Sequence, residues 1–411
     1  MRELTVVCAL LLTYALTTEG RCAESTWKIG TPIVTYYAGP AMTDTVAQQM
    51  AEGGLNVVWC GRDQLDMMQR HHLRGMVRDG LLAPATLDDP AKRPQLDALI
   101  ESVKNHPAMY AYYLIDEPNA SRFPEFGKLV AYLRERDPAH LAYINLFPTY
   151  ATNEQLGNKG DVATAYSEHL QQFVDTVKPD LISYDHYHFA VAGDTGQYFL
   201  NLGLVRQAAL KAGIPFLNIV QACTWSPAMR IPSSNEVRWL VNTSLAYGAQ
   251  GVSYYVYCYP GHLGALATAD GQPTVLYQSL KRTNRDFAAC AAQLQPLQSL
   301  GAYHCGTIPM GGVALPANAP FRLDPAIPAS QPVDLKPAEG FVLGYFGPAG
   351  GAPTHVVVVN LNYSKSAETT LIAPSAVQVF NPARGSWSAT RPSRLPLRLE
   401  PGGVELVRLA K

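Results

Sequence analysis

The sequence predicts an α/β protein, in which a (β/α)8 TIM barrel is followed by a small all-β sandwich. Apolar, strand-like runs alternate with helix-period segments over about 270 residues, which is typical of a closed parallel barrel. The length of 411 residues suits such a barrel plus one smaller domain. From about residue 300 the helical pattern stops, and short strands separated by turn residues take its place.

Eight segments of the first part are predicted as strands because they are short apolar runs rich in β-branched and aromatic residues. They cover residues 32–37, 55–60, 73–77, 109–115, 141–146, 180–184, 216–220 and 251–257. An open doubly wound sheet is the alternative. No Gly-x-Gly-x-x-Gly motif or P-loop follows the first strand, which favours the barrel.

Amphipathic segments between these strands are predicted as helices. In residues 94–104, for example, the apolar side chains recur at helical spacing on one face. Gly213 is a helix-stop signal after residues 202–212. The other predicted helices cover residues 44–52, 126–136, 167–177, 236–247 and 277–294.

The C-terminal part, residues 300–411, is predicted to be a β-sandwich. Proline and glycine are dense between Pro309 and Pro353, and short alternating runs follow. These predicted strands cover residues 341–346, 355–361, 368–372, 376–380, 395–399 and 404–409. The barrel is then assigned to residues 27–299.

The first 23 residues are typical of a secretory signal peptide. Arg2 gives a short basic start, and residues 4–16 are mainly apolar but too few to span a membrane as a helix. A buried N-terminal helix is the alternative. We therefore expect a secreted or periplasmic protein that makes no membrane contact once the signal is removed.

Seven cysteines are present, of which Cys8 belongs to the predicted signal. Export permits disulfides. Cys290 could pair with Cys305, and Cys223 with Cys258; free buried cysteines are the alternative. No Cys-x-x-Cys pair occurs, which argues against a zinc framework.

Composition also excludes several classes of partner. The chain has 32 basic and 33 acidic residues, a net charge of −1 and no run of like charge, so no nucleic-acid partner is expected. Phosphate-binding loops are lacking, and no cofactor is expected. A serine esterase is disfavoured because no Gly-x-Ser-x-Gly motif appears.

In a barrel, the chemistry is expected at the carboxyl ends of the strands. Here those ends carry aromatic rings, amides and carboxylates, the side chains that stack on sugar rings and bind sugar hydroxyls. The predicted substrate-binding residues are Asp116, Tyr37, Trp59, Asn145, Tyr187, His188, Gln221, Trp225, Tyr255 and Tyr257.

Cleavage of a glycosidic bond requires two carboxyl groups, one to protonate the leaving oxygen and one to attack or to activate water. Asp116-Glu117-Pro118 closes an apolar strand, where two adjacent carboxylates are costly without a function. This motif is the strongest candidate for the acid. Strand alternation predicts that Asp116 and Glu117 point to different sides. A helix N-cap pair is the alternative reading of the motif.

The segment Ile115-Asp116-Glu117-Pro118 resembles the Asn-Glu-Pro motif of clan A glycoside hydrolases, with Asp in place of Asn. In that clan the glutamate is the general acid/base, which the resemblance assigns to Glu117. Residues 359–364, 379–387 and 399–409 are similar to the β-sandwich that ends many such hydrolases.

The sequence departs from the clan at strand seven, where the clan's nucleophile is a glutamate and this chain has Gln221. An amide cannot act as a nucleophile. Asp185, at the end of strand six, is the predicted substitute, as nucleophile or as base for a water molecule. A separation from Glu117 of about 5 Å would indicate a retaining enzyme, and roughly 6.5 to 9.5 Å an inverting one. A structural or sugar-binding carboxylate is the alternative for Asp185.

Two further groups of residues are ambiguous. His186 and His188 point the same way on a strand and could hold a metal, but no third ligand is evident, and hydrogen bonding to sugar hydroxyls is favoured. Arg62 and Arg78 could bind a uronate or sulfate, or could pair with the neighbouring Asp63 and Asp79.

The sequence thus favours a glycosidase that acts on a poly- or oligosaccharide. A catalytically degenerate carbohydrate-binding protein on the same scaffold is the second hypothesis, and Gln221 favours it. A metal-dependent barrel hydrolase is the third.

Overall fold

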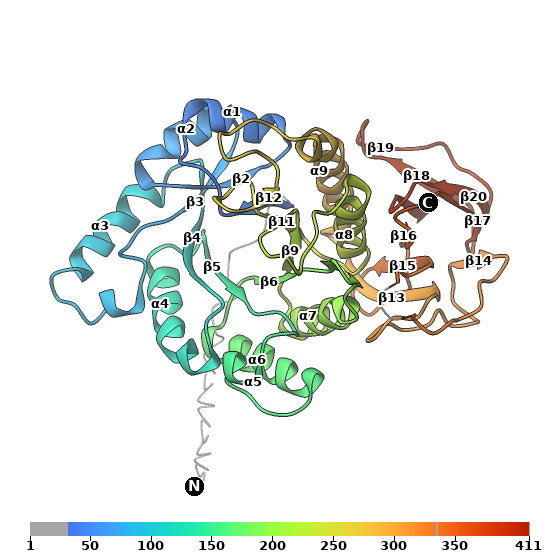
Figure 1. The fold of residues 1–411 in the computed structure, drawn as a ribbon, viewed down its shortest axis with the longest axis horizontal. Helices are drawn as coiled ribbons and strands as arrows, with labels where there is room; N and C mark the ends of the chain where they lie inside the picture. The colour runs from blue at the N-terminus through green and yellow to red at the C-terminus, as the bar shows by residue number, and fades with distance from the viewer. Residues whose placement is uncertain (1–31, 334–335, 411) are drawn as a thin grey trace, which may run out of the picture.

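The computed structural model describes residues 32–333 and 336–410. Eight parallel strands form a barrel-like sheet with helices around it, and antiparallel sheets form the C-terminal part (Figure 1). The predicted fold class is confirmed. The predicted signal peptide, residues 1–23, lies outside the described residues.

The barrel strands follow one another around the sheet in chain order. They are β1 (Ile33–Tyr37), β2 (Val57–Cys60), β3 (Arg74–Val77), β4 (Met109–Asp116), β5 (Leu141–Leu146), β6 (Ile182–His186), β9 (Phe216–Gln221) and β11 (Gly251–Tyr255). Their carboxyl ends therefore meet on one side, where loops carry the candidate site.

Asn56 joins the two edge strands, β1 and β2. Its backbone N–H donates to the Val34 carbonyl at 2.9 Å. Its side-chain oxygen accepts from the Val34 N–H at 2.9 Å, and its amide donates to the Pro32 carbonyl at 2.6 Å. These bonds satisfy backbone groups that an open edge would leave unpaired, and so they close the barrel.

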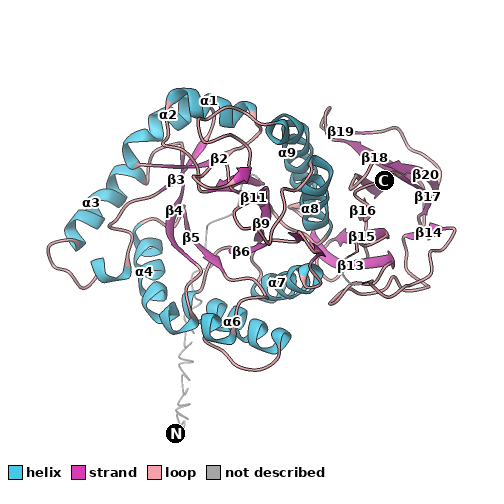
Figure 2. Cartoon of the chain, viewed as in Figure 1, coloured by secondary structure: helices cyan, strands magenta, loops and turns pink. Residues whose placement is uncertain are grey.

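The outer ring consists of helices, as Figure 2 shows in cyan. They are α1 (Asp44–Glu52), α2 (Leu65–Arg70), α3 (Arg93–Val103), α4 (Phe123–Arg136), α5 (Asn153–Leu156), α6 (Val162–Val177), α7 (Tyr198–Ala212), α8 (Ser234–Ala246) and α9 (Val275–Leu294). Inside the barrel, apolar side chains of alternate strand positions, such as Ile33, Met76, Leu141 and Leu217, form a separate buried cluster. The centre of the barrel is thus a packed core, and the site can lie only at its mouth.

The C-terminal part contains a six-stranded and a three-stranded antiparallel sheet. The first comprises β13 (Gln298–Gly306), β15 (Gly340–Gly347), β16 (His355–Asn360), β21 (Val404–Leu409), β18 (Val377–Asn381) and β19 (Ser386–Trp387), in that order. The second comprises β14 (Arg322–Asp324), β17 (Ala367–Ile372) and β20 (Arg394–Leu399). Side chains from both sheets share one buried cluster, which makes this part a sandwich.

The sandwich packs against α8, next to α9, as Figure 1 shows. At Gly344 the two backbones approach so closely that a Cβ atom would lie 2.0 Å from the Ala246 carbonyl oxygen. Nearer the barrel mouth, the Tyr363 hydroxyl donates to the buried Asp194 carboxylate at 2.9 Å. The sandwich is thereby attached to a loop that follows β6.

The structure differs from the sequence prediction at several elements. Helix α2 forms between β2 and β3, where none was predicted, and α7 begins at Tyr198 rather than at residue 202. The long strand β13 was missed because its glycines interrupt the apolar alternation, and the predicted domain junction after residue 299 lies inside it. Among the described residues, none of the helices combines the length and apolar character that crossing a membrane requires.

The two disulfides that the sequence allowed, Cys290 with Cys305 and Cys223 with Cys258, are not formed. Cys223, Cys258, Cys290 and Cys305 are all free and buried. They are therefore packing residues, which was the alternative reading.

Candidate active site

Strand β4 delivers its two acidic residues to one cavity. Leu114 is an extra residue in the pairing with β5, and this bulge brings Asp116 opposite Asn145. The Glu117 N–H still donates to the Asn145 carbonyl at 2.9 Å, but Glu117 has a φ of 44°, in the left-handed region. Because the chain turns there, both carboxyl groups line the same cavity. The prediction that they point to different sides is wrong, and so is the N-cap alternative, since Asn119 and Arg122 hold the cap positions.

Asn145 is the centre of the hydrogen-bond network. Its side-chain amide donates to Asp116 at 3.0 Å and to Asp185 at 2.9 Å, while its oxygen accepts from the Ser183 hydroxyl at 2.9 Å. The Tyr37 hydroxyl donates to the other oxygen of Asp116 at 2.6 Å. From β5, the amide thus holds the carboxylates of the two flanking strands, β4 and β6, within reach of one nitrogen atom.

The carboxyl groups of Glu117 and Asp185 both line this cavity, and they interact closely enough that each shifts the pKa of the other. Burial, and next the negative charge of Asp116, raise the pKa of Glu117 to about 7. The pKa of Asp185, which is only 2% exposed, is raised well above its usual range by burial and by the charge of Glu117. Two carboxyl groups in such contact cannot both ionise near neutral pH, so the pair retains one proton.

Aromatic side chains form the wall of this cavity, which has a volume of about 470 Å³. Tyr37 contacts Trp59 with ring centroids 5.1 Å apart and stacks on Tyr255 at 5.8 Å. Tyr187 in turn lies 4.8 Å from Tyr255 and 4.7 Å from Trp225. The rings thus form a continuous belt contributed by β1, β2, β11 and the loops after β6 and β9, suited to the apolar faces of a sugar.

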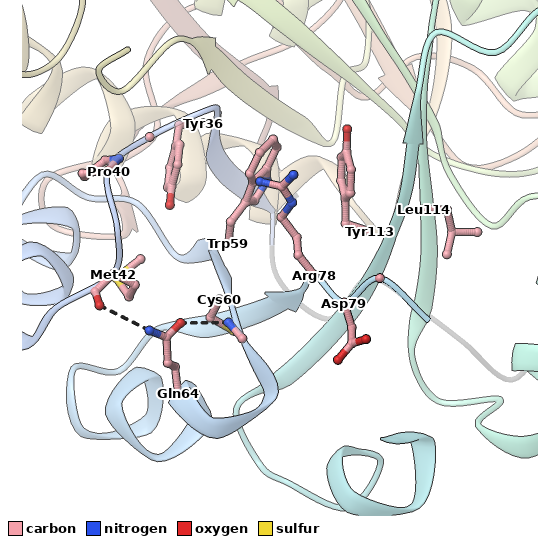
Figure 3. A pocket seen from close by; sticks show the side chains of 13 residues that line it. Tyr36, Pro40, Met42, Trp59, Cys60, Gln64, Arg78, Asp79, Tyr113 and Leu114 are labelled. Carbon is pink, nitrogen blue, oxygen red and sulfur yellow. Dashed lines mark hydrogen bonds between the residues drawn. The ribbon is translucent and has the colours of Figure 1, made fainter. Parts of the chain in front are cut away.

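Two further cavities adjoin this one. The first, of about 480 Å³, shares Trp59 and Arg78 with the central cavity and is shown in Figure 3. The other, of about 500 Å³, shares Glu117, Asp185 and Trp225. Together the three cavities form a row across the barrel mouth, and the carboxyl pair lies in the wall common to two of them.

Seven of the ten residues predicted to bind substrate line the central cavity together with both predicted catalytic residues: Asp116, Tyr37, Trp59, Asn145, Tyr187, Trp225 and Tyr255. The structure corrects the prediction for the remaining three. His188 is buried and stacks on Trp239, with ring centroids 5.1 Å apart, and Tyr257 is fully buried and donates to Gln49.

Gln221 is the third correction, and its surroundings explain why an amide occupies the end of β9. It is fully buried. Its oxygen accepts from the Phe189 N–H at 2.8 Å, and its nitrogen donates to the carbonyls of Phe189 and Arg230 at 3.1 and 2.9 Å. Only a side chain with both a donor and an acceptor satisfies these groups, so Gln221 ties two loops together.

The two histidines at and just after the end of β6, His186 and His188, do not form a metal site. His186 is fully buried and hydrogen-bonds Asn201 at 3.0 Å, and burial lowers its pKa to about 3. His188 lies 3.5 Å from the Asp194 carboxylate. Within residues 32–333 and 336–410, no three His, Cys, Asp or Glu side chains are grouped so that they could hold a metal ion.

Sequence reasoning missed other residues of the cleft. Tyr150 and Met229 line the third cavity, and His262 lines the central one, where it lies 3.1 Å from the Tyr255 hydroxyl. All three belong to loops several residues beyond a strand end. A search that extended past the last strand residue would have included Tyr150, because it follows β5 by four positions.

The chain matches no known family profile, and no curated protein resembles it in sequence at a significant level. Its fold is similar to that of solved β-galactosidases. A GH42 β-galactosidase from G. stearothermophilus, solved as a catalytic mutant, has a TM-score of 0.56 at 9% identity, with 93% of this chain and 98% of that chain covered. The β-galactosidase of Bacillus circulans sp. alkalophilus has a TM-score of 0.53 at 9% identity, covering 92% and 99%.

A third β-galactosidase, from the psychrophilic Marinomonas ef1, has a TM-score of 0.46 at 12% identity; the match covers 67% of this chain and spans 63% of that protein's length. The structural neighbours are clan A glycoside hydrolases, the clan that the Asp-Glu-Pro motif resembles. At these identities the likeness shows that the chain has their fold.

Gln221→Glu should destabilise the protein without creating a nucleophile. The new carboxylate would face the carbonyl oxygens of Phe189 and Arg230 inside the protein, which should lower the free energy of unfolding by roughly 3 to 5 kcal/mol. Urea unfolding measures the change, and Gln95→Glu on exposed helix α3 is the matched control. A stable Gln221→Glu variant with higher glycosidase activity would contradict this structural role.

Proposed function

We propose that the chain is a secreted glycoside hydrolase that cleaves O-glycosidic bonds, with Glu117 as its general acid/base. One observation carries the proposal: two interacting carboxyl groups, those of Glu117 and Asp185, line one aromatic cleft at the mouth of a barrel. A general acid that acts near neutral pH needs a raised pKa, and Glu117 has one of about 7.

The pair begins the reaction with one proton. Glu117 donates it to the glycosidic oxygen as the bond from that oxygen to the anomeric carbon breaks. Asp116, held by Tyr37 and Asn145, places a further carboxylate at the cavity, whose charge stabilises the positive charge that develops on the sugar ring. Water then adds to the anomeric carbon, and its proton passes to Asp185, which restores the singly protonated pair.

The contact between Glu117 and Asp185 bears on stereochemistry. In glycosidases a carboxyl spacing of about 5 Å indicates retention and one of roughly 6.5 to 9.5 Å indicates inversion, and the interaction of Glu117 with Asp185 does not by itself assign either spacing. The proposal therefore assigns the proton donor and the base, and leaves the configuration of the product to be measured by NMR of the first anomer formed.

The substrate class follows from the cleft. The aromatic belt offers rings to stack on pyranose faces, and the amides and carboxylates offer partners for hydroxyl groups. Because three cavities adjoin in a row, the site has room for sugar units on both sides of the carboxyl pair. We therefore expect a poly- or oligosaccharide substrate.

Export is part of the same proposal. The basic start and short apolar run of the first 23 residues are typical of a cleaved signal, and a glycan-degrading enzyme meets its substrate outside the cytoplasm. N-terminal sequencing of the mature protein from the medium or periplasm tests it; a protein that keeps Met1 and stays in the cytoplasm would refute export.

Glu117→Gln and Asp185→Asn should each lower kcat/KM by roughly 10²- to 10⁴-fold, because neither amide can transfer the proton that the pair shares. The measurement is hydrolysis of a panel of aryl-glycosides and polysaccharides. Glu125→Gln, which removes an exposed carboxylate on α4, is the control and should retain wild-type rates. Full activity in Asp185→Asn would exclude Asp185 as the base.

Asp116→Asn should shift the pH profile of kcat/KM. The charge of Asp116 raises the pKa of Glu117, so its removal lowers that pKa, and the protonated acid is lost at a lower pH. The limb of the profile that reports ionisation of Glu117, expected near pH 7 in the wild type, should therefore move toward acid, whereas the control Asp63→Asn should leave it in place. A limb that stays fixed or moves to higher pH would contradict the assignment of Glu117 as the acid.

A carbohydrate-binding protein without turnover is the second candidate. The observation that favours it is the lack of a carboxylate at the end of β9, where Gln221 is committed to backbone contacts. The same substrate panel separates the two functions: binding of glycans by a wild-type protein that cleaves none of them would establish the second.

A further inference from the structure

Arg78 follows β3 and lines both the central cavity and the one beside it. Among the described residues that line the three cavities of the cleft, it is the one arginine or lysine. The other ionisable side chains around the central cavity include Asp116, Glu117 and Asp185. The cleft therefore has one cationic position, at the end away from the third cavity.

The guanidinium group of Arg78 is held between two aromatic rings. Its central carbon lies 4.5 Å from the Trp59 ring centroid and 5.2 Å from that of Tyr113. Figure 3 shows the side chain extending between these two rings. Cation–π contacts of this kind fix the plane of the guanidinium group and occupy its two faces. Its N–H edges remain available for an acceptor that lies in the plane.

No carboxylate of the described chain neutralises Arg78 by an ion pair. The neighbouring Asp79, which the sequence offered as a partner, accepts a hydrogen bond from the Leu81 N–H at 2.9 Å. In Figure 3 its carboxyl group points away from Arg78. The predicted alternative, that Arg78 pairs with Asp79, is therefore wrong.

We propose that Arg78 selects glycans that carry an anionic substituent, a carboxylate or a sulfate ester, on the sugar unit beside Trp59. A planar guanidinium with free edges binds such groups through two parallel hydrogen bonds. The negative charges of Asp116 and of the singly protonated Glu117–Asp185 pair repel the same substituent, so the charges of the cleft also fix the direction in which the chain of sugars lies. This inference rests on the proposed glycan site and adds its substrate class.

The test is a binding measurement that needs no turnover. Isothermal titration calorimetry on the Glu117→Gln protein would compare a neutral galacto-oligosaccharide, an oligogalacturonate and a sulfated galacto-oligosaccharide of equal length. At least one acidic probe should bind roughly tenfold or more tightly than the neutral one, and its affinity should fall as salt is added. Which acidic probe binds distinguishes the carboxylate from the sulfate.

Arg78→Met keeps an apolar stem against the rings and removes the charge. It should weaken binding of the acidic probe by roughly 10- to 100-fold and leave the neutral probe unaffected. Arg78→Lys should retain part of the affinity for the acidic probe, because the lysine ammonium keeps the positive charge but cannot donate two parallel hydrogen bonds as the guanidinium does. The matched control is Arg62→Met, an exposed arginine near the same strand ends that does not line the cavities.

The outcomes separate this inference from the proposed function. Equal affinity for neutral and acidic probes, or an equal loss of both in Arg78→Met, would overturn the role of Arg78 even if the wild type hydrolyses glycosides. Failure to bind either acidic probe would overturn it too. Selective, Arg78-dependent binding without hydrolysis by the wild type would support it and refute the proposed catalysis.

Discussion

The contact between the carboxyl groups of Glu117 and Asp185 constrains the rest of the site. Two full negative charges about 4 Å apart would repel each other by roughly 4 kcal/mol at an effective dielectric constant of 20, which is enough to keep one proton on the pair. The surrounding groups are arranged around the remaining charge. Asn145 donates to Asp185 at 2.9 Å, and the aromatic rings line the same cavity. Burial disfavours the ionised form of the two carboxyl groups and raises their pKa, and for this reason the pair can donate a proton near neutral pH.

The fold holds this pair by means that lie outside the cavity. Gln221 fastens the loops after β6 and β9 to each other, and these loops carry Tyr187 and Trp225 into the ring belt. The sandwich adds Tyr363, which binds Asp194 in the first of these loops. A domain far from the chemistry in sequence thus supports one wall of the cleft, and this gives the sandwich a structural role at the site.

Much of this arrangement could be predicted from sequence, because the carboxyl ends of the parallel strands of a barrel always meet at one face. That rule located Asp116, Glu117, Asp185 and most of the ring belt. It failed where local geometry decides: Glu117 turns into a left-handed conformation that alternation does not foresee. It also failed where partners distant in sequence decide. Buried hydrogen bonds remove Gln221 from the cavity, and nothing near Arg78 in the sequence indicates its position between two rings.

The shared proton is the central claim, and infrared difference spectroscopy tests it most directly. The absorption of protonated carboxyl groups would be followed from pH 4 to 9 in the wild type and in the double variant Glu117→Gln, Asp185→Asn. The pKa of Glu405 is also raised to about 7 by burial. Both proteins contain Glu405, so its absorption cancels in the difference between their spectra. We predict one protonated carboxyl at pH 7 that the double variant lacks. Identical spectra at that pH would mean that both groups are ionised, and would contradict the account.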